Sequence, residues 1–145
     1  MVILGINYFF HDSTACIVSD GKLLVAIEEE RLSRDKHTNT FPQLAIAKCL
    51  EFSGLSVGDV DAIAVSIQPN KDWNKKITYG LRNITSIRPF LSHELINTFS
   101  KQRHLKKWYK STWSDTAKAP KIYYIPHHLS HAAGTFLVSG FESSA

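Results

Sequence analysis

Apolar residues gather in short runs along the first third of the chain, with polar turns between them. Residues 2–8 are almost wholly apolar, as expected of a central β-strand. Residues 13–19 and 22–27 form two further runs rich in aliphatic residues, and the dipeptide Asp20-Gly21 between them is a strong signal for a two-residue hairpin turn. The pattern predicts three antiparallel strands, the last with an exposed acidic end at residues 28–30.

A helix and two more strands are predicted further along. A polar loop at residues 33–40 leads to Pro42, which suits the first turn of a helix, and Gly54 is placed to cap the C-terminus of that helix. Residues 61–67 and 122–125 are predicted as strands. The apolar run at residues 132–138, which follows the histidines after Pro126, is predicted to continue as a buried helix.

The order of these elements is strand, strand, strand, helix, strand, insertion, strand, helix. This is the order of one lobe of an actin-like ATPase, a ribonuclease H-like α/β fold in which antiparallel strands lead a mixed sheet covered by helices. Such a fold has two lobes, with the ligand between them. We therefore expect residues 1–145 to be a truncated first lobe that lacks the second lobe and is inactive alone.

Composition places the chain among ordinary soluble domains. It has 145 residues, 43% of them hydrophobic and 21% charged, which suits one globular domain. No apolar run approaches the ~20 residues of a membrane span. The N-terminus lacks the basic region of a signal peptide, so we expect a cytoplasmic protein with no membrane partner. Cys16 and Cys49 have no metal-site or redox spacing and are predicted to be buried small apolar residues without a disulfide.

Positive charge is concentrated in one segment. Residues 71–121 hold 12 Lys and Arg against 3 acidic residues, while the rest of the chain holds 5 against 10. Aromatic residues that can stack on bases occur in the same segment, namely Trp73, Tyr79, Trp108, Tyr109 and Trp113. No nucleic-acid-binding motif accompanies them, so the segment is predicted to be a solvated helical insertion at about residues 70–120, with nucleic-acid binding as an alternative.

Two short stretches carry groups suited to chemistry. His127 and His131 lie four residues apart at a predicted strand-to-helix junction, so their imidazoles share one helix face and can bind a common divalent metal. A hydrogen-bonded histidine pair is the alternative. The turn between the first two strands contains His11, Asp12 and Ser13. Its hydroxyl and backbone N–H groups can hold phosphate or carbonyl oxygens, although such residues are also common in ordinary turns.

Three blocks, at residues 5–15, 28–42 and 127–133, together resemble the N-terminal part of the NodU/CmcH-type O-carbamoyltransferases. Members of that family carbamoylate hydroxyl groups of nodulation factors and of several antibiotics. The resemblance spans nearly the whole chain, and the second and third blocks are the specific ones. The basic segment at residues 71–118 contributes nothing to it.

The resemblance implies a two-part enzyme. A C-terminal domain of the YrdC type, absent from this sequence, would join carbamoyl phosphate and ATP into carbamoyl adenylate with release of pyrophosphate. The actin-like domain, similar to the tRNA threonylcarbamoyl-transferring proteins, would pass the carbamoyl group to a hydroxyl of a sugar or other small-molecule acceptor. By the same resemblance, His127 and His131 bind a divalent metal, with iron as a candidate, together with an Asp beyond residue 145.

The family's catalytic positions match His11 and Lys36. An imidazole can take the proton of the acceptor hydroxyl, and an ammonium group can polarise the carbamoyl oxygen. Asp12 and Ser13 are the candidate co-substrate-binding residues. A homodimer and the absence of a nucleic-acid partner are further expectations.

An actin-like kinase or ATPase is the main alternative to a carbamoyltransferase. It would require a glycine-rich phosphate turn with a lysine or acidic metal ligands, where this chain has a His-Asp-Ser turn and paired histidines. The acceptor, the metal's identity and the oligomeric state are left open by the sequence.

Overall fold

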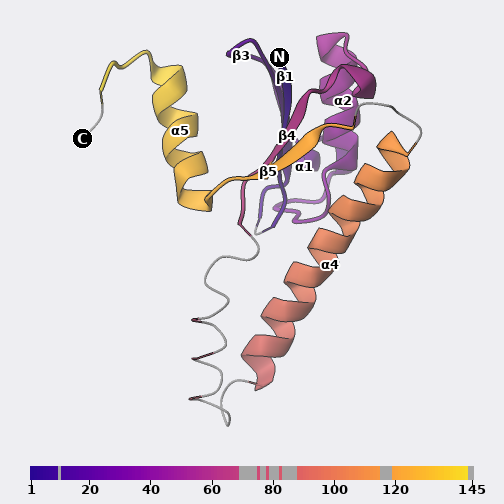
Figure 1. Cartoon of the computed structure of the whole chain (residues 1–145), viewed down its shortest axis with the longest axis vertical. Helices are drawn as coiled ribbons and strands as arrows, with labels where there is room; N and C mark the ends of the chain where they lie inside the picture. Colours follow the sequence, from indigo (N-terminus) through magenta and orange to yellow (C-terminus); the bar gives the residue numbers. More distant parts are fainter. Residues whose placement is uncertain are drawn as a thin grey trace. The chain divides into compact units, whose positions relative to one another are not determined.

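The computed structural model describes residues 1–9, 11–68, 75, 78, 82, 88–114 and 119–143, with side chains in the long helix α4 described from residue 99 on. The chain divides into two units, residues 1–68 with 119–145, and residues 69–118. The first unit contains a five-stranded sheet (Figure 1). Its strands are β1 (Val2–Asn7), β2 (Thr14–Ser19), β3 (Lys22–Glu28), β4 (Ala62–Val65) and β5 (Lys121–Tyr124).

The sheet is mixed, with the order β3-β2-β1-β4-β5. β1, β2 and β3 pair antiparallel, while β4 and β5 continue the sheet parallel to β1. Asp20 and Gly21 both adopt positive φ, at 49° and 79°, as the two central residues of a tight hairpin turn do. The prediction of an α/β chain with three leading antiparallel strands is confirmed.

One face of the sheet is covered by α2 (Gln43–Ser53), which packs against β2 and β3. In β1, β2 and β4, alternate residues are buried on this face, as the two-residue period of a strand predicts. The buried positions are Leu4 and Ile6 in β1, Ala15 and Ile17 in β2, and Ile63 and Val65 in β4. The connection from α2 to β4 contains the short 3-10 helix η1 (Val57–Asp59). Gly54 adopts a left-handed conformation at the C-terminus of α2, as predicted.

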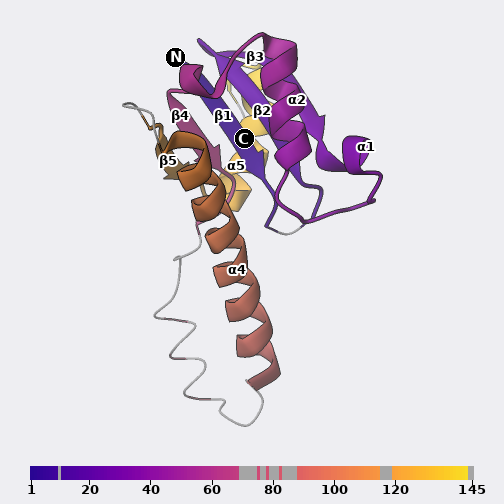
Figure 2. The same cartoon turned by 90° about the vertical axis from the view of Figure 1, so that its right-hand side faces the viewer.

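The helix that carries the histidines, α5 (His127–Ser139), lies on the opposite side of the sheet from α2 (Figures 1 and 2). None of the α5 side chains that the structure describes is buried, and Leu137 is 76% exposed. The prediction of a buried helix was therefore wrong. Small residues on the facing strands, among them Gly5 and Ala64, line a hollow of about 220 Å³ there instead of packing tightly against the helix.

The start of α2 depends on a residue that the sequence placed on the surface. The helix begins at Gln43, with Pro42 as the residue before it, and Pro42 has no side-chain acceptor for the first backbone N–H groups. Glu29 fills that role from the short helix α1 (Glu29–Ser33), which was not predicted. Its buried carboxylate accepts the N–H of Leu44 at 3.2 Å and of Ala45 at 2.7 Å. The expectation of an exposed acidic strand end was wrong for Glu29.

Replacing Glu29 with alanine should destabilise the fold by ~2 kcal/mol, since two helix N–H groups lose a charged acceptor. Urea unfolding followed by circular dichroism measures the change. Glu51→Ala is the matched control, because among the described residues the Glu51 side chain makes an exposed ion pair with Lys48 alone, and its loss should cost less than ~0.5 kcal/mol. Equal unfolding midpoints for the two variants would contradict the capping role.

Gly5 is required by close packing within the sheet. A Cβ added there would lie 2.5 Å from Sγ of its cross-strand partner Cys16. Gly5→Ala should therefore lower the free energy of unfolding by about 1–3 kcal/mol. Gly134→Ala, in α5 with open space around it, should be neutral or raise stability by up to ~1 kcal/mol. Thermal unfolding of both variants tests this, and Cys16→Ala should rescue Gly5→Ala if the sulfur is the obstacle.

Both cysteines are free thiols, as predicted. Burial raises the pKa of Cys49 to about 11 and also raises the pKa of Cys16. The thiolate is the reactive form, so these shifts suit packed side chains better than reactive ones.

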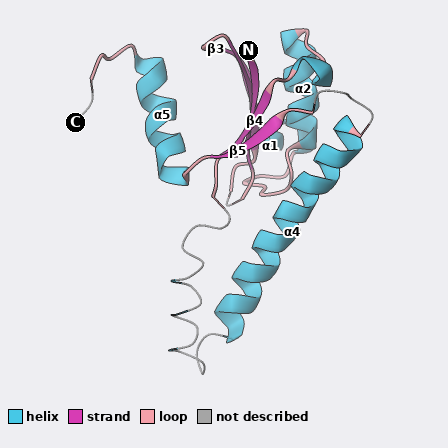
Figure 3. Cartoon of the chain, in the orientation of Figure 1, coloured by secondary structure: helices cyan, strands magenta, loops and turns pink. Residues whose placement is uncertain are grey.

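The longest described segment of the second unit is the helix α4 (Arg88–Trp113), which Figure 3 shows as one uninterrupted helix. Within it the Trp113 ring contacts Trp108 edge-on at 5.2 Å and lies 5.4 Å from Tyr109. The predicted basic insertion therefore contains a long helix, while Trp73 and Tyr79 lie outside the described residues. No helix among the described residues is long and apolar enough to cross a membrane.

Candidate functional site

Polar side chains meet at the edge of the sheet where β1, β4 and β5 end. These strands are parallel, so their carboxyl ends point the same way. Asn7 ends β1, Ser66 follows β4, and His127 begins the helix after β5. The turn from β1 to β2, with His11 and Asp12, leaves the same edge. In open α/β sheets this edge is where ligands bind.

A continuous hydrogen-bond path links these positions. The amide nitrogen of Asn7 donates to the carbonyl oxygens of His11 at 3.3 Å and Asp12 at 3.1 Å. The amide oxygen of Asn7 accepts the Ser66 hydroxyl at 2.6 Å. Nδ1 of His127 in turn donates to the Ser66 carbonyl oxygen at 3.2 Å. The β1–β2 turn and the histidine pair are therefore held in one framework.

The structure brings His127 and His131 together as their spacing predicts. Their Nε2 atoms lie 3.1 Å apart, with the rings 4.5 Å apart and nearly perpendicular. Nδ1 of His127 donates its proton to the Ser66 carbonyl, so Nε2 carries the lone pair and faces His131.

This geometry fits a divalent ion. Two imidazole nitrogens that each lie ~2.1 Å from one ion are about 3.0–3.4 Å apart. The outer hydrogen bond from His127 to a backbone carbonyl is also the usual support of a metal-binding histidine. The same separation of the two Nε2 atoms is also expected if Nε2 of His131 donates a hydrogen bond directly to Nε2 of His127, with no ion between them. The metal thus stays a prediction, and its two expected ligands are in place.

At the β1–β2 turn, the Asp12 carboxylate joins two imidazoles. Oδ2 lies 2.7 Å from Nδ1 of His11, and Oδ1 lies 2.9 Å from Nδ1 of His37. The hydrogen bond from His37, followed by that from His11, lowers the pKa of Asp12, so the carboxylate is anionic. An anion repels phosphate. Asp12 is therefore better suited to orienting His11 than to the predicted binding of a phosphate-bearing co-substrate.

Ser13 and Lys36 occupy contrasting positions. The Ser13 side chain is buried and its hydroxyl donates to the Thr40 carbonyl at 2.6 Å, which ties the turn to the loop after α1. Its predicted co-substrate-binding role stays untested and receives no support from this geometry. Lys36 is exposed in that loop, and its ammonium group has no hydrogen-bond or ion-pair partner among the described residues. It is free to approach a substrate.

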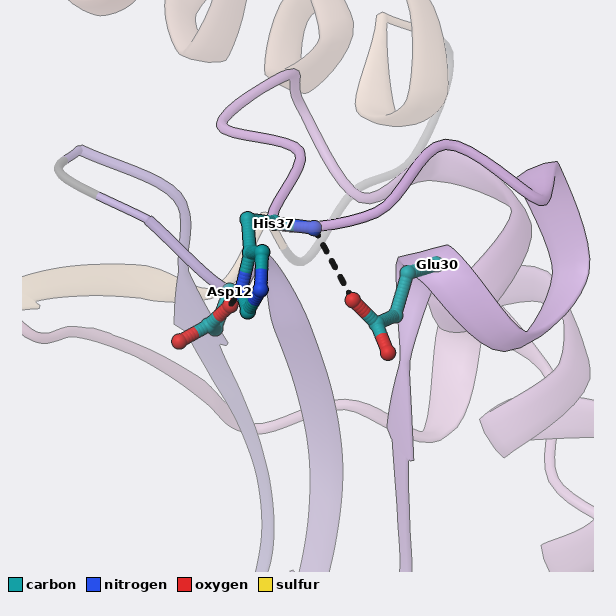
Figure 4. Close-up of side chains that lie close together, drawn as sticks. All are labelled: Asp12, Glu30 and His37. Atoms are coloured by element: carbon teal, nitrogen blue, oxygen red, sulfur yellow. Dashed lines mark hydrogen bonds and ion pairs between the residues drawn. The ribbon is translucent and has the colours of Figure 1, made fainter.

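The sequence analysis missed four polar residues of this edge, namely Asn7, Glu30, His37 and Ser66. Asn7 had a usable signal, because it is the polar residue at the end of an apolar strand. His37 and Glu30 lie in the block at residues 28–42 that resembles the family, but nothing local showed that the fold brings them to Asp12. Donor atoms of Asp12, Glu30 and His37 lie within 4.8 Å of one another (Figure 4), and hydrogen bonds within the cluster account for that closeness without a cation.

These features define a mixed α/β domain with two histidine-bearing elements at the carboxyl edge of its sheet. Comparison with known families matches residues 2–145 to the family described as "Carbamoyltransferase N-terminus". The chain belongs to this family, and the resemblance found in its motifs is confirmed.

Similar proteins include the nodulation protein NolNO of Sinorhizobium fredii, which is 34% identical over 139 residues, covering 95% of this chain and 19% of that protein. The uncharacterized protein sll1178 of Synechocystis is 32% identical over 149 aligned positions, covering 99% of this chain and 24% of its own length. An uncharacterized 19.2 kDa protein of Rhizobium etli is 45% identical over 58 residues, which are 40% of this chain and 34% of that protein. The chain thus spans about a quarter or less of the two relatives that match it nearly throughout.

Proposed function

We propose that this chain contributes the carbamoyl-transfer site of an ATP-dependent O-carbamoyltransferase. The reaction is transfer of a carbamoyl group from carbamoyl adenylate to a hydroxyl of a sugar or other small molecule. The observation that supports it most is the hydrogen-bonded framework from His11 through Asn7 and Ser66 to His127. This framework holds His11, the candidate general base, and the His127–His131 pair, the candidate ligands of one metal ion, at the same edge of the sheet.

We also propose that the domain is an actin-like lobe. The strand order β3-β2-β1-β4-β5, with antiparallel pairing of the first three strands and parallel pairing of the rest, supports this assignment. Ligands of such folds lie at the carboxyl edge of the parallel strands, where the polar residues gather here.

His11 is suited to activate the acceptor. Asp12 accepts a hydrogen bond from Nδ1 of His11, which leaves Nε2 with a lone pair. In the proposed step, Nε2 takes the hydroxyl proton while the acceptor oxygen attacks the carbamoyl carbon. A new C–O bond forms, the C–O bond to the adenylate phosphate breaks, and AMP leaves. Lys36, whose exposed ammonium group has no partner among the described residues, polarises the carbamoyl oxygen.

His127 and His131 are the residues that would hold a divalent metal, for which iron is a candidate. A bound ion supplies positive charge that stabilises anionic phosphate oxygens. The identity of the ion and its further ligands are likewise part of what we propose and are tested with it.

The test uses the complete gene product that carries this chain, supplied with ATP, radiolabelled carbamoyl phosphate and a panel of sugar and other alcohol acceptors. The expected result is pyrophosphate release that requires the carbamoyl donor, together with label on one class of acceptor. Release of inorganic phosphate from ATP without the donor would favour a kinase or ATPase. If both activities are absent and the protein binds nucleic acid with an affinity that falls steeply with salt, nucleic-acid binding by the basic segment at residues 71–121 would be favoured instead.

A further inference from the structure

The loop at residues 34–40 and the β1–β2 turn are joined by direct contacts. The Ser13 N–H donates to the Thr38 carbonyl at 3.0 Å, and the Ser13 hydroxyl donates to the Thr40 carbonyl. Both Ser13 and Thr38 are buried. A displacement of the loop is therefore transmitted to the turn that carries His11.

His37 is the loop residue whose side chain reaches that turn. Its Nδ1 lies 2.9 Å from Oδ1 of Asp12, on the carboxylate oxygen that His11 does not use. The hydrogen bond that His37 donates to Asp12 raises the pKa of His37, and the negative charges of Asp12 and Glu30 add to the effect. The two imidazoles thus engage both oxygens of one carboxylate, and they fix its rotation.

The backbone at this contact adopts a costly conformation. Asp12 and His37 have positive φ values of 53° and 54°, a region that non-glycine residues enter at a cost of about 1–2 kcal/mol each. Glu30 holds His37 in place, since its carboxylate accepts the His37 backbone N–H at 2.9 Å (Figure 4). Two strained residues therefore face each other across the hydrogen bond between them, as occurs where a fold orients functional groups.

We infer that His37 is a positioning residue, which through Asp12 holds His11 as the Nδ1-protonated tautomer with Nε2 directed at the acceptor. The role of Nε2 toward the acceptor rests on the proposed function, while the effect on the His11 tautomer does not. Asp12 is 40% exposed and has no other side chain on its carboxylate oxygens among the described residues, so without His37 it is free to turn. His11 then loses its fixed partner.

Two variants separate the imidazole from the backbone conformation. His37→Gly removes the side chain and accepts positive φ without strain. His37→Asn keeps a short side-chain N–H donor and tolerates the left-handed region better than most residues. Arg34→Gly is the control, because Arg34 also has positive φ, at 63°, in the same loop but makes no contact with Asp12.

The complete gene product is labelled with nitrogen-15 histidine, and the His11 tautomer is measured by NMR at about pH 8, above the ordinary imidazole pKa of ~6.5. Wild type and Arg34→Gly should show His11 protonated at Nδ1. His37→Gly should show a mixture of the two His11 tautomers, and His37→Asn should restore the Nδ1-protonated form. In the transfer assay, His37→Gly should lower kcat at least ~10-fold with little change in acceptor KM.

An unchanged His11 tautomer in His37→Gly overturns the inference, whatever the activity. If His37→Gly shows a mixture of His11 tautomers but the wild-type protein transfers no carbamoyl group, the coupling from His37 to His11 is upheld and the carbamoyl transfer proposed for His11 is rejected. A mixture in Arg34→Gly as large as in His37→Gly also overturns the inference, because it would trace the effect to the loop backbone.

Discussion

Replacing His131 with alanine in the complete gene product is expected to remove tightly bound divalent metal and to reduce carbamoyl transfer by at least ~100-fold. His127→Ala should do the same, since the two Nε2 atoms lie 3.1 Å apart and one imidazole cannot hold the ion alone. Donor-dependent pyrophosphate release should continue if adenylate formation takes place in another domain, as the family resemblance implies. Elemental analysis after gel filtration measures the metal.

His128→Ala is the matched control for this experiment. His128 is the exposed neighbour of His127 and is not a member of the Nε2 pair, so its replacement should leave metal content unchanged. Circular dichroism verifies that each variant folds. Full metal content in both His127→Ala and His131→Ala would show that the pair is only a hydrogen-bonded contact.

Replacing His11 with alanine is expected to lower the rate of carbamoyl transfer by about 10²–10⁴-fold, the usual loss when a general base is removed. Transfer assays with saturating acceptor measure the rate. A rate equal to wild type would remove His11 from the mechanism.

Lys36→Ala should slow transfer by a smaller factor, about 10–100-fold, because it removes charge stabilisation and leaves the base in place. Lys22→Ala provides a control, since Lys22 is also an exposed lysine but begins β3 at the hairpin turn, away from the β1–β2 turn. If Lys36→Ala and Lys22→Ala are equally active, Lys36 is a solvated loop residue.

The sequence by itself determined the features that depend on neighbours along the chain. Strand alternation, the Asp20-Gly21 hairpin and the Gly54 helix cap follow from local backbone preference, and the structure has all three. The pairing of His127 with His131 also follows from helix geometry alone. The motifs sufficed to identify the family because they consist of residues close together in the sequence.

Tertiary structure alone decided the contacts between distant segments. Glu29 looked like a surface acid, yet it is buried and caps α2, because Pro42 provides no acceptor there. His37 reaches Asp12 from 25 residues away. Periodicity also predicted the apolar character of α5 but not its exposure, since exposure depends on what packs against a helix. Local patterns encode backbone conformation, while the partner of a buried or charged group depends on how distant segments pack together.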